Sequence, residues 1–143
     1  MHEPVLLEEV LEALKIRPDG RYVDGTLGQA GHAVAIASRL TTGKLLGLDV
    51  DEENLRTAED RLQPLGDRTL TRRVNFRGLQ EILRDVGWTE VDGMLFDLGV
   101  STGQLTGPRL SFDSDAPLDF RIDPAAPDTG ASFLARADES SLT

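Results

Sequence analysis

The stretch that indicates the fold class reads Tyr22-Val23-Asp24-Gly25-Thr26-Leu27-Gly28-Gln29-Ala30-Gly31-His32. Its first three residues are typical of a short buried strand, and a helix is expected from Gly31 to Leu40. Glycines between them let the backbone turn sharply and approach a ligand closely, next to the free N–H groups of a helix N-terminus. A Gly-x-x-Gly loop alone is explained equally well as a tight turn.

Strands and helices alternate on both sides of this loop. We expect strands over residues 22–24, 44–49, 70–76 and 91–97, and helices over 5–14, 31–40, 51–62 and 78–86. The second strand is nearly continuous in apolar residues, as parallel strands covered on both faces are. Connections of helix length imply parallel strands and right-handed crossovers, and therefore an α/β fold.

Asp49 ends the second strand, 21 residues after Gly28. This is close to the spacing at which an acidic residue accepts hydrogen bonds from a ribose in nucleotide-binding α/β folds. The alternative is that Asp49 caps the next helix. Asp51 is better placed for that role, which favours a ligand role for Asp49.

Asp97 follows the apolar fourth strand and precedes Gly99. Ligands of open α/β sheets bind outside the carboxyl ends of the strands, near the switch point that we expect between the first and fourth strands. We therefore predict that Asp97 lies in the site, although it could also cap a turn.

Composition narrows the class of protein. The chain has 143 residues and no cysteine, so disulfides, thiolate metal sites and a cysteine nucleophile are excluded, and we expect no metal. No apolar run has membrane-spanning length and the N-terminus lacks a basic start, so we expect a cytoplasmic protein with no membrane partner. The net charge of −10 argues against strong binding of nucleic acid by this chain alone. The cluster Arg68, Arg72, Arg73 and Arg77 is explained as a solvated strand and loop.

The chain resembles the first half of the family that methylates the N4 amine of a cytidine in small-subunit ribosomal RNA, the RsmH or MraW family. The matching text is His2-x-Pro4-Val5-Leu6-Leu7-x-Glu9-Val10, Asp24-x-Thr26-x-Gly28-x-x-Gly31-His32, Gly47-x-Asp49-x-Asp51, Val91-Asp92-Gly93-x-Leu95-x-Asp97-Leu98-Gly99-Val100-Ser101-x-x-Gln104-Leu105 and Ser111-Phe112-x-x-Asp115-x-Pro117-Leu118-Asp119-x-Arg121-x-Asp123. The string covers residues 2–140 in order.

The resemblance implies a Rossmann-like S-adenosylmethionine-dependent methyltransferase fold, incomplete here, with the first four strands and their helices. Residues 1–100 would be the cofactor-binding core, 101–130 a long active-site loop, and 131–143 the start of a truncated helical region. The implied cofactor is S-adenosyl-L-methionine. Its implied contacts are Gly28, Ala30, Gly31 and His32 of the loop, Asp49 at the ribose, Phe76 near the adenine, and Asp97 and Gln104 near the methionine end. For methyl transfer, Asp97 is the candidate catalytic residue.

These residues also have simpler explanations. Phe76 could pack in the core at a strand end, and His32, taken alone, would be a surface residue near a helix N-terminus. Gln104 would be an ordinary loop amide.

The chain departs from the family pattern in places. The family has a second glycine where Ala30 stands, methionine where Phe120 stands, and different text over residues 106–110. It also continues for a similar length again. The implied partners are small-subunit ribosomal RNA or the assembled subunit. We also expect either a homodimer or a partner that supplies the other half. Two alternatives to the methyltransferase remain: a non-catalytic S-adenosylmethionine-binding or interaction module, and an NAD-dependent oxidoreductase domain.

Overall fold

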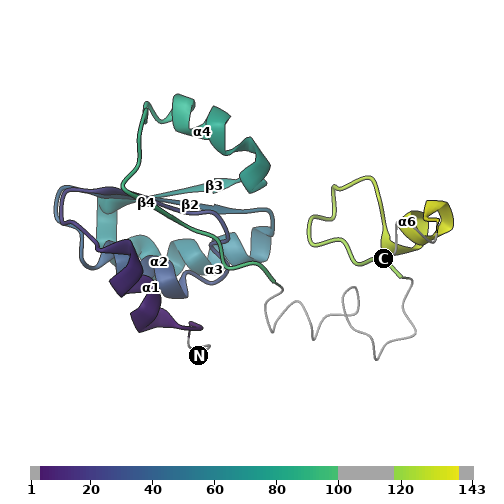
Figure 1. The fold of residues 1–143 in the computed structure, drawn as a ribbon, viewed down its shortest axis with the longest axis horizontal. Helices are drawn as coiled ribbons and strands as arrows, with labels where there is room; N and C mark the ends of the chain where they lie inside the picture. Colours follow the sequence, from purple (N-terminus) through teal and green to yellow (C-terminus); the bar gives the residue numbers. More distant parts are fainter. Residues whose placement is uncertain (1–3, 100–117, 139–143) are drawn as a thin grey trace. The chain divides into compact units, whose positions relative to one another are not determined.

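The computed structural model describes residues 4–99 and 118–138. The chain divides into two compact units between Leu98 and Gly99, and each is described by itself. In the first unit helices and strands alternate (Figure 1). Its elements are α1 (Leu7–Leu14), β1 (Arg21–Asp24), α2 (Gly31–Ala37), β2 (Lys44–Asp49), α3 (Glu52–Leu62), the 3-10 turn η1 (Gln63–Arg68), β3 (Thr69–Arg73), the 3-10 turn η2 (Phe76–Gly78), α4 (Leu79–Asp85) and β4 (Gly93–Leu95).

The four strands form one parallel sheet in the order β3-β2-β1-β4. Val23 of β1 lies between Leu46 of β2 and Met94 of β4 in the register. The chain builds outward from β1 to β2 and β3 and then returns to the other side of β1. The predicted switch point between the first and fourth strands is confirmed, as is the α/β class.

Helices cover both faces of the sheet, with α1, α2 and α3 on one side and α4 on the other (Figure 1). Tyr22 and Leu45 pack with the first three helices, where Ile36 of α2 is fully buried. Val23 and Leu46 point to the opposite face and pack with Trp88 and the apolar side of α4. Neighbouring residues of one strand thus bury side chains on opposite faces, which explains the continuous apolar text of β2.

Two predicted strands are shorter in the structure. The strand expected over 70–76 is β3, Thr69–Arg73; Asn75 follows it and caps η2 by accepting a hydrogen bond from the N–H of Arg77. The strand expected over 91–97 is β4, only Gly93–Leu95, which pairs with three of the four residues of β1. Each strand ends where its pairing partner ends: β3 stops at Arg73 opposite Asp49 of β2, and β4 stops at Leu95 opposite Asp24 of β1.

The start of α3 agrees with the sequence. The Asp51 carboxylate accepts hydrogen bonds from the N–H groups of Glu53 and Asn54, so it caps the helix as predicted. This leaves the Asp49 side chain available for another role.

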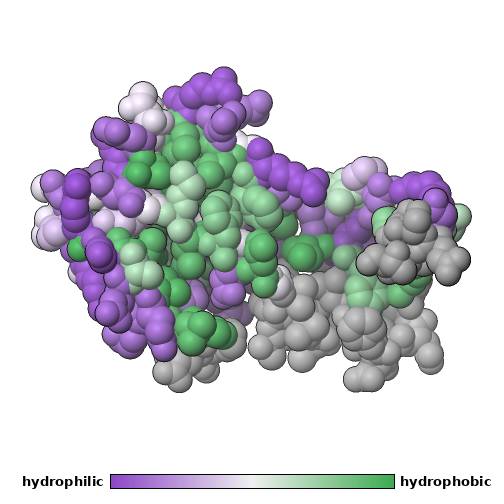
Figure 2. All heavy atoms as spheres, in the orientation of Figure 1, coloured by the Kyte–Doolittle hydropathy of each residue, from purple (hydrophilic) through white to green (hydrophobic). Residues whose placement is uncertain are grey.

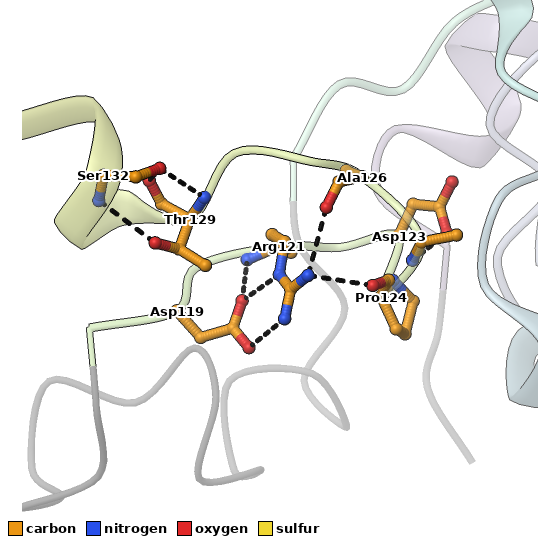
Figure 3. Close-up of polar contacts among 8 residues, drawn as sticks. Asp119, Arg121, Asp123, Pro124, Ala126, Thr129 and Ser132 are labelled. Atoms are coloured by element: carbon orange, nitrogen blue, oxygen red, sulfur yellow. Dashed lines mark hydrogen bonds and ion pairs between the residues drawn. The ribbon is translucent and has the colours of Figure 1, made fainter.

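The described part of the second unit is a loop closed around Arg121 and followed by α6 (Gly130–Arg136). The Arg121 guanidinium forms a two-pronged ion pair with Asp119, Nε to Oδ1 at 2.6 Å and Nη2 to Oδ2 at 3.0 Å. Its Nη1 donates to the carbonyls of Pro124 and Ala126 (Figure 3). Thr129 caps α6 reciprocally with Ser132. The hydrogen bonds of Arg121 therefore stay within its own loop.

An apolar surface lies at the β4 side of the first unit. Figure 2 shows apolar side chains gathered over the middle of this unit. Met94 and Phe96 are each about two-fifths exposed, at 42% and 41%, and Leu98 is more exposed still. In the described residues β4 pairs on one side only. Across residues 4–99 and 118–138, the structure contains no helix with the length and apolar character of a membrane span.

Candidate functional site

The loop after β1 is held between the strands on either side of it. The N–H of Gly25 donates to the carbonyl of Leu95 in β4, and the N–H of Leu27 donates to the carbonyl of Leu48 in β2, both at 2.9 Å. A loop anchored on both neighbours has little freedom to move. It therefore forms a fixed floor at the carboxyl ends of β1, β2 and β4, where ligands of open α/β sheets bind.

Asp49 extends this anchoring through its side chain. Oδ2 accepts a hydrogen bond from the N–H of Gly28 at 2.7 Å, and Oδ1 accepts one from the N–H of Asp51 at 2.9 Å. A carboxylate has about four lone-pair positions, so two can still accept hydrogen bonds from a ligand. Asp49 thus orders the glycine loop and keeps acceptor positions for a ligand.

Asp97 is connected to the same loop from the other side. Its backbone N–H donates to the Thr26 hydroxyl oxygen at 2.7 Å, across a sequence separation of 71 residues. The side chain of Asp97 is exposed at the end of β4. Its position next to the β1 loop agrees with the predicted crevice at the switch point.

Asp24 is a third carboxylate in this region and was not predicted as a site residue. It is 2% exposed and accepts a hydrogen bond from the N–H of Thr26 at 3.1 Å. Burial raises the pKa of Asp24 to about 6, and the negative charges of Asp49 and Asp97 add to this rise against the opposing effects of Thr26 and His32. The region therefore carries a negative potential that favours a cationic ligand or a proton.

Two aromatic rings meet across the sheet. Phe76 follows β3 and Phe96 follows β4, at opposite edges of the described sheet, yet their ring centroids are 5.5 Å apart at an interplanar angle of 71°. Phe96 leans over the end of β1, where a Cβ on Gly25 would collide with its ring. Phe76 is 38% exposed. Simple core packing is therefore the wrong explanation for Phe76, which presents apolar ring surface at the carboxyl end of the sheet.

His32 connects the loop to the N-terminal segment. It is buried, and its Nε2 lies 2.9 Å from the carbonyl oxygen of Val5. The expectation that His32, taken alone, lies on the surface is wrong, because the chain before α1 covers it. Pro4 of the same segment packs closely against Gly31, so that a Cβ at Gly31 would lie 2.5 Å from Pro4 Cγ.

Gly28 and Ala30 both have left-handed backbone conformations, with φ of 51° and 62°. A Cβ at Gly28 would meet only the Thr26 carbonyl, at 3.9 Å, so its conformation and not its space requires glycine. Ala30 is fully buried in the core cluster under α2. Its methyl group therefore points into the core, and the left-handed φ explains why glycine suits this position.

The structure brings together most of the residues predicted for the site. Seven of the predicted residues belong to the first unit and lie at or next to the carboxyl ends of the strands: Gly28, Ala30, Gly31, His32, Asp49, Phe76 and Asp97. Gln104 lies outside the described residues, as does most of the predicted 101–130 loop. Asp24 and Thr26 were missed as individual site residues, although the loop motif contains both.

A parallel sheet with a β1 loop bracketed by two carboxylate-bearing strand ends is typical of Rossmann-like nucleotide-binding folds. The model of the MraW methylase family matches residues 1–143, and the chain belongs to this family. It is 45% identical over 144 aligned residues to the ribosomal RNA small subunit methyltransferase H of Brevibacillus brevis. That alignment covers 99% of the chain but 46% of the relative, so the chain spans about half of the relative's length.

Solved structures agree on the fold. TrmN from Thermus thermophilus is 28% identical, with a TM-score of 0.53 over 64% of this chain and 26% of that one. A SAM-dependent O-methyltransferase from Thermotoga maritima is 19% identical, with a TM-score of 0.52 over 66% of this chain and 36% of that one. The Rossmann-like methyltransferase fold predicted from the sequence is confirmed in its first four strands.

Proposed function

We propose that the carboxyl ends of β1, β2 and β4 bind S-adenosyl-L-methionine, and that the methyltransferase containing this chain methylates the N4 amine of a cytidine in small-subunit ribosomal RNA. One observation carries the cofactor proposal. The β1 loop is pinned between Asp49 and Asp97, with the Asp24 carboxyl buried beside it. The name of the Brevibacillus brevis relative supports the substrate.

The charges of the site favour this cofactor over NAD. S-adenosylmethionine carries a positive sulfonium and a positive ammonium group, whereas NAD carries a negative pyrophosphate. Three carboxyl groups attract the first and repel the second. The loop also lacks the Gly-x-Gly-x-x-Gly spacing of dinucleotide-binding folds. The oxidoreductase alternative therefore loses its support.

The residues fit the parts of the cofactor. The free lone pairs of Asp49 would accept hydrogen bonds from the ribose hydroxyls, and the exposed ring surface of Phe76 would contact the adenine. Gly28, Ala30, Gly31 and His32 would shape the backbone along the methionine side. Gln104 remains a candidate for that side from the sequence alone.

When bound, the cofactor supplies an electrophilic methyl group on a positively charged sulfur. The protein must hold the cytidine amine in line with the methyl–sulfur bond, so that the nitrogen–carbon bond forms as the carbon–sulfur bond breaks. The amine lone pair is delocalised into the ring, so a carboxylate that accepts one of its protons would raise its reactivity. We assign this role, or orientation of the methyl donor, to Asp97. The base must leave its stack to enter the site.

The net charge of this chain bears on how the RNA substrate would be bound. With a net charge of −10, this chain has few means to hold phosphates, so we expect another part of the protein or a second copy to contribute to RNA binding. A cytoplasmic location, where small subunits are assembled, fits this substrate. The alternative is a non-catalytic S-adenosylmethionine-binding module, which the acidic charge favours.

Calorimetric titration tests the cofactor. We expect S-adenosylmethionine and its demethylated product to bind, and NAD not to bind. Tight binding of NAD, or no binding of either methionine derivative, would contradict the proposal.

Methyl incorporation into small subunits then separates an enzyme from a binding module. Residues 1–143 should bind the cofactor but show little or no turnover alone. Robust turnover by this chain would contradict the expected need for another RNA-binding part.

A further inference from the structure

We propose that Thr26 is a positioning residue for Asp97, an inference that rests on the proposed function. The Thr26 hydroxyl oxygen accepts the backbone N–H of Asp97 at 2.7 Å, and its own N–H donates to Asp24 Oδ1 at 3.1 Å. Thr26 is thus hydrogen-bonded to the carboxylate of Asp24 and to the backbone of Asp97.

The need for such a contact follows from where β4 ends. Regular pairing with β1 stops at Leu95, whose carbonyl accepts the N–H of Gly25. Beyond that point the sheet no longer fixes the backbone. The bond to Thr26 is the next one along the chain, and it sets the direction in which Asp97 leaves the strand.

The position of Asp97 matters because its proposed partners are small polar groups. A carboxylate oxygen must lie within about 3 Å of the donor atom whose proton it accepts, so a displacement of about one ångström greatly weakens the interaction. The buried end of this contact is rigid, since Asp24 is 2% exposed and the last three residues of β1 are all buried. Thr26 therefore transmits the rigidity of β1 to a residue outside the regular sheet.

Three substitutions separate the hydroxyl from the shape of the side chain. Thr26→Val keeps the volume and removes the acceptor, whereas Thr26→Ser keeps the acceptor and removes the methyl group. Thr57→Val is the control, because the Thr57 hydroxyl also makes one hydrogen bond to the backbone, donating to the carbonyl of Glu53, but it does so within α3 and outside the β1 loop.

We expect Thr26→Val to weaken S-adenosylmethionine binding about tenfold by calorimetry, the equivalent of one lost hydrogen bond. Thr26→Ser and Thr57→Val should stay within about twofold of the parent protein. In an Asp97→Ala background, Thr26→Val should change the affinity by less than about twofold, since coupled residues are not additive. A purely structural role would give the same loss in both backgrounds and would overturn the proposal.

Amide hydrogen exchange, followed by NMR, measures directly whether the Asp97 N–H is hydrogen-bonded. The Asp97 N–H should exchange faster in Thr26→Val than in the parent protein, and Thr26→Ser should restore its protection. Equal exchange in all three proteins would overturn the proposal. If the parent protein binds no S-adenosylmethionine, the proposed function fails, and this measurement still decides whether Thr26 positions Asp97. Thr26→Ala replaces Thr26→Val in every comparison if the valine variant does not fold.

Discussion

The Asp49 carboxylate accepts a hydrogen bond from the backbone N–H of Gly28 at 2.7 Å. This bond joins the end of β2 to the glycine loop after β1, across 21 residues of sequence. The residue proposed to bind the ribose therefore also holds the loop against which the cofactor would lie. Substitution of Asp49 should thus affect binding in two ways, directly and through the loop.

Asp49→Ala should weaken S-adenosylmethionine binding by more than the ~2 kcal/mol expected for a lost charge-assisted pair of hydrogen bonds, because Gly28 also loses its acceptor. Asp49→Asn should cost less, since its amide oxygen can still accept from Gly28. Calorimetry measures both, with Asp60→Asn on the exposed side of α3 as the control. Unchanged affinity in Asp49→Ala would remove Asp49 from the site.

Asp24 should make the stability depend on pH. Burial raises its pKa from 3.8 to about 6, so the folded protein holds this proton more tightly than the unfolded chain does. The resulting stability is fully present below pH 3.8 and is lost as the pH rises through about 6, by an amount on the order of 3 kcal/mol.

Asp24→Asn should remove this dependence and raise the free energy of unfolding near pH 7. Its amide oxygen can still accept the N–H of Thr26. Urea unfolding of both proteins between pH 4.5 and pH 7.5, roughly the range over which the proton is lost, measures the difference. Identical pH profiles would show that Asp24 titrates as an ordinary carboxyl.

The ionisation of Asp24 should also make cofactor affinity depend on pH. A cationic ligand stabilises the charged form of Asp24 and releases its proton, so affinity should rise with pH through about 6. Titrations in buffers of different ionisation enthalpy count the released protons. Asp24→Asn should release fewer protons, and equal release by both proteins would contradict this coupling.

Any side chain at Gly31 should lower the stability of the protein, because Pro4 packs closely against this position. A Cβ at this position would lie 2.5 Å from Pro4 Cγ, so Gly31→Ala should cost about 1–3 kcal/mol of stability through overpacking. In a Pro4→Gly background the same substitution should cost clearly less. Thermal unfolding of the four proteins measures the coupling. Additive losses would show that another contact requires glycine.

The outer edge of β4 should recruit a second chain. Met94 and Phe96 are each about two-fifths exposed beside an edge with backbone groups that strands tend to pair. Light scattering on the purified protein should show a dimer or larger species, and Met94→Lys should shift it toward monomer. If the parent protein is a monomer, residues 101–130 should cover the edge and be protected from hydrogen exchange. A monomer with this segment fully exchanging would contradict both outcomes.

The sequence by itself determined the order of the elements and the class of fold, because these depend on local patterns. Apolar periodicity located β1, β2 and the helices, and Asp51 was recognised as a cap because its partners are two and three residues away. The spacing of Asp49 from the glycine loop and the position of Asp97 after β4 pointed to the crevice. The family resemblance supplied Phe76 and His32, which periodicity could not have distinguished from ordinary core or surface residues.

Only the tertiary structure decided which of these groups touch and what state they are in. Thr26 and Asp97 are 71 residues apart, and His32 and Val5 are 27 apart, so no local pattern contains either contact. The raised pKa of Asp24 comes mainly from burial, with a smaller contribution from the charges of Asp49 and Asp97. Strand order brings residues from distant parts of the chain to one end of the sheet. The hydrogen-bond energies and pKa values at this end of the sheet depend on interatomic distances and on the exclusion of solvent, and both are set only when the chain has folded.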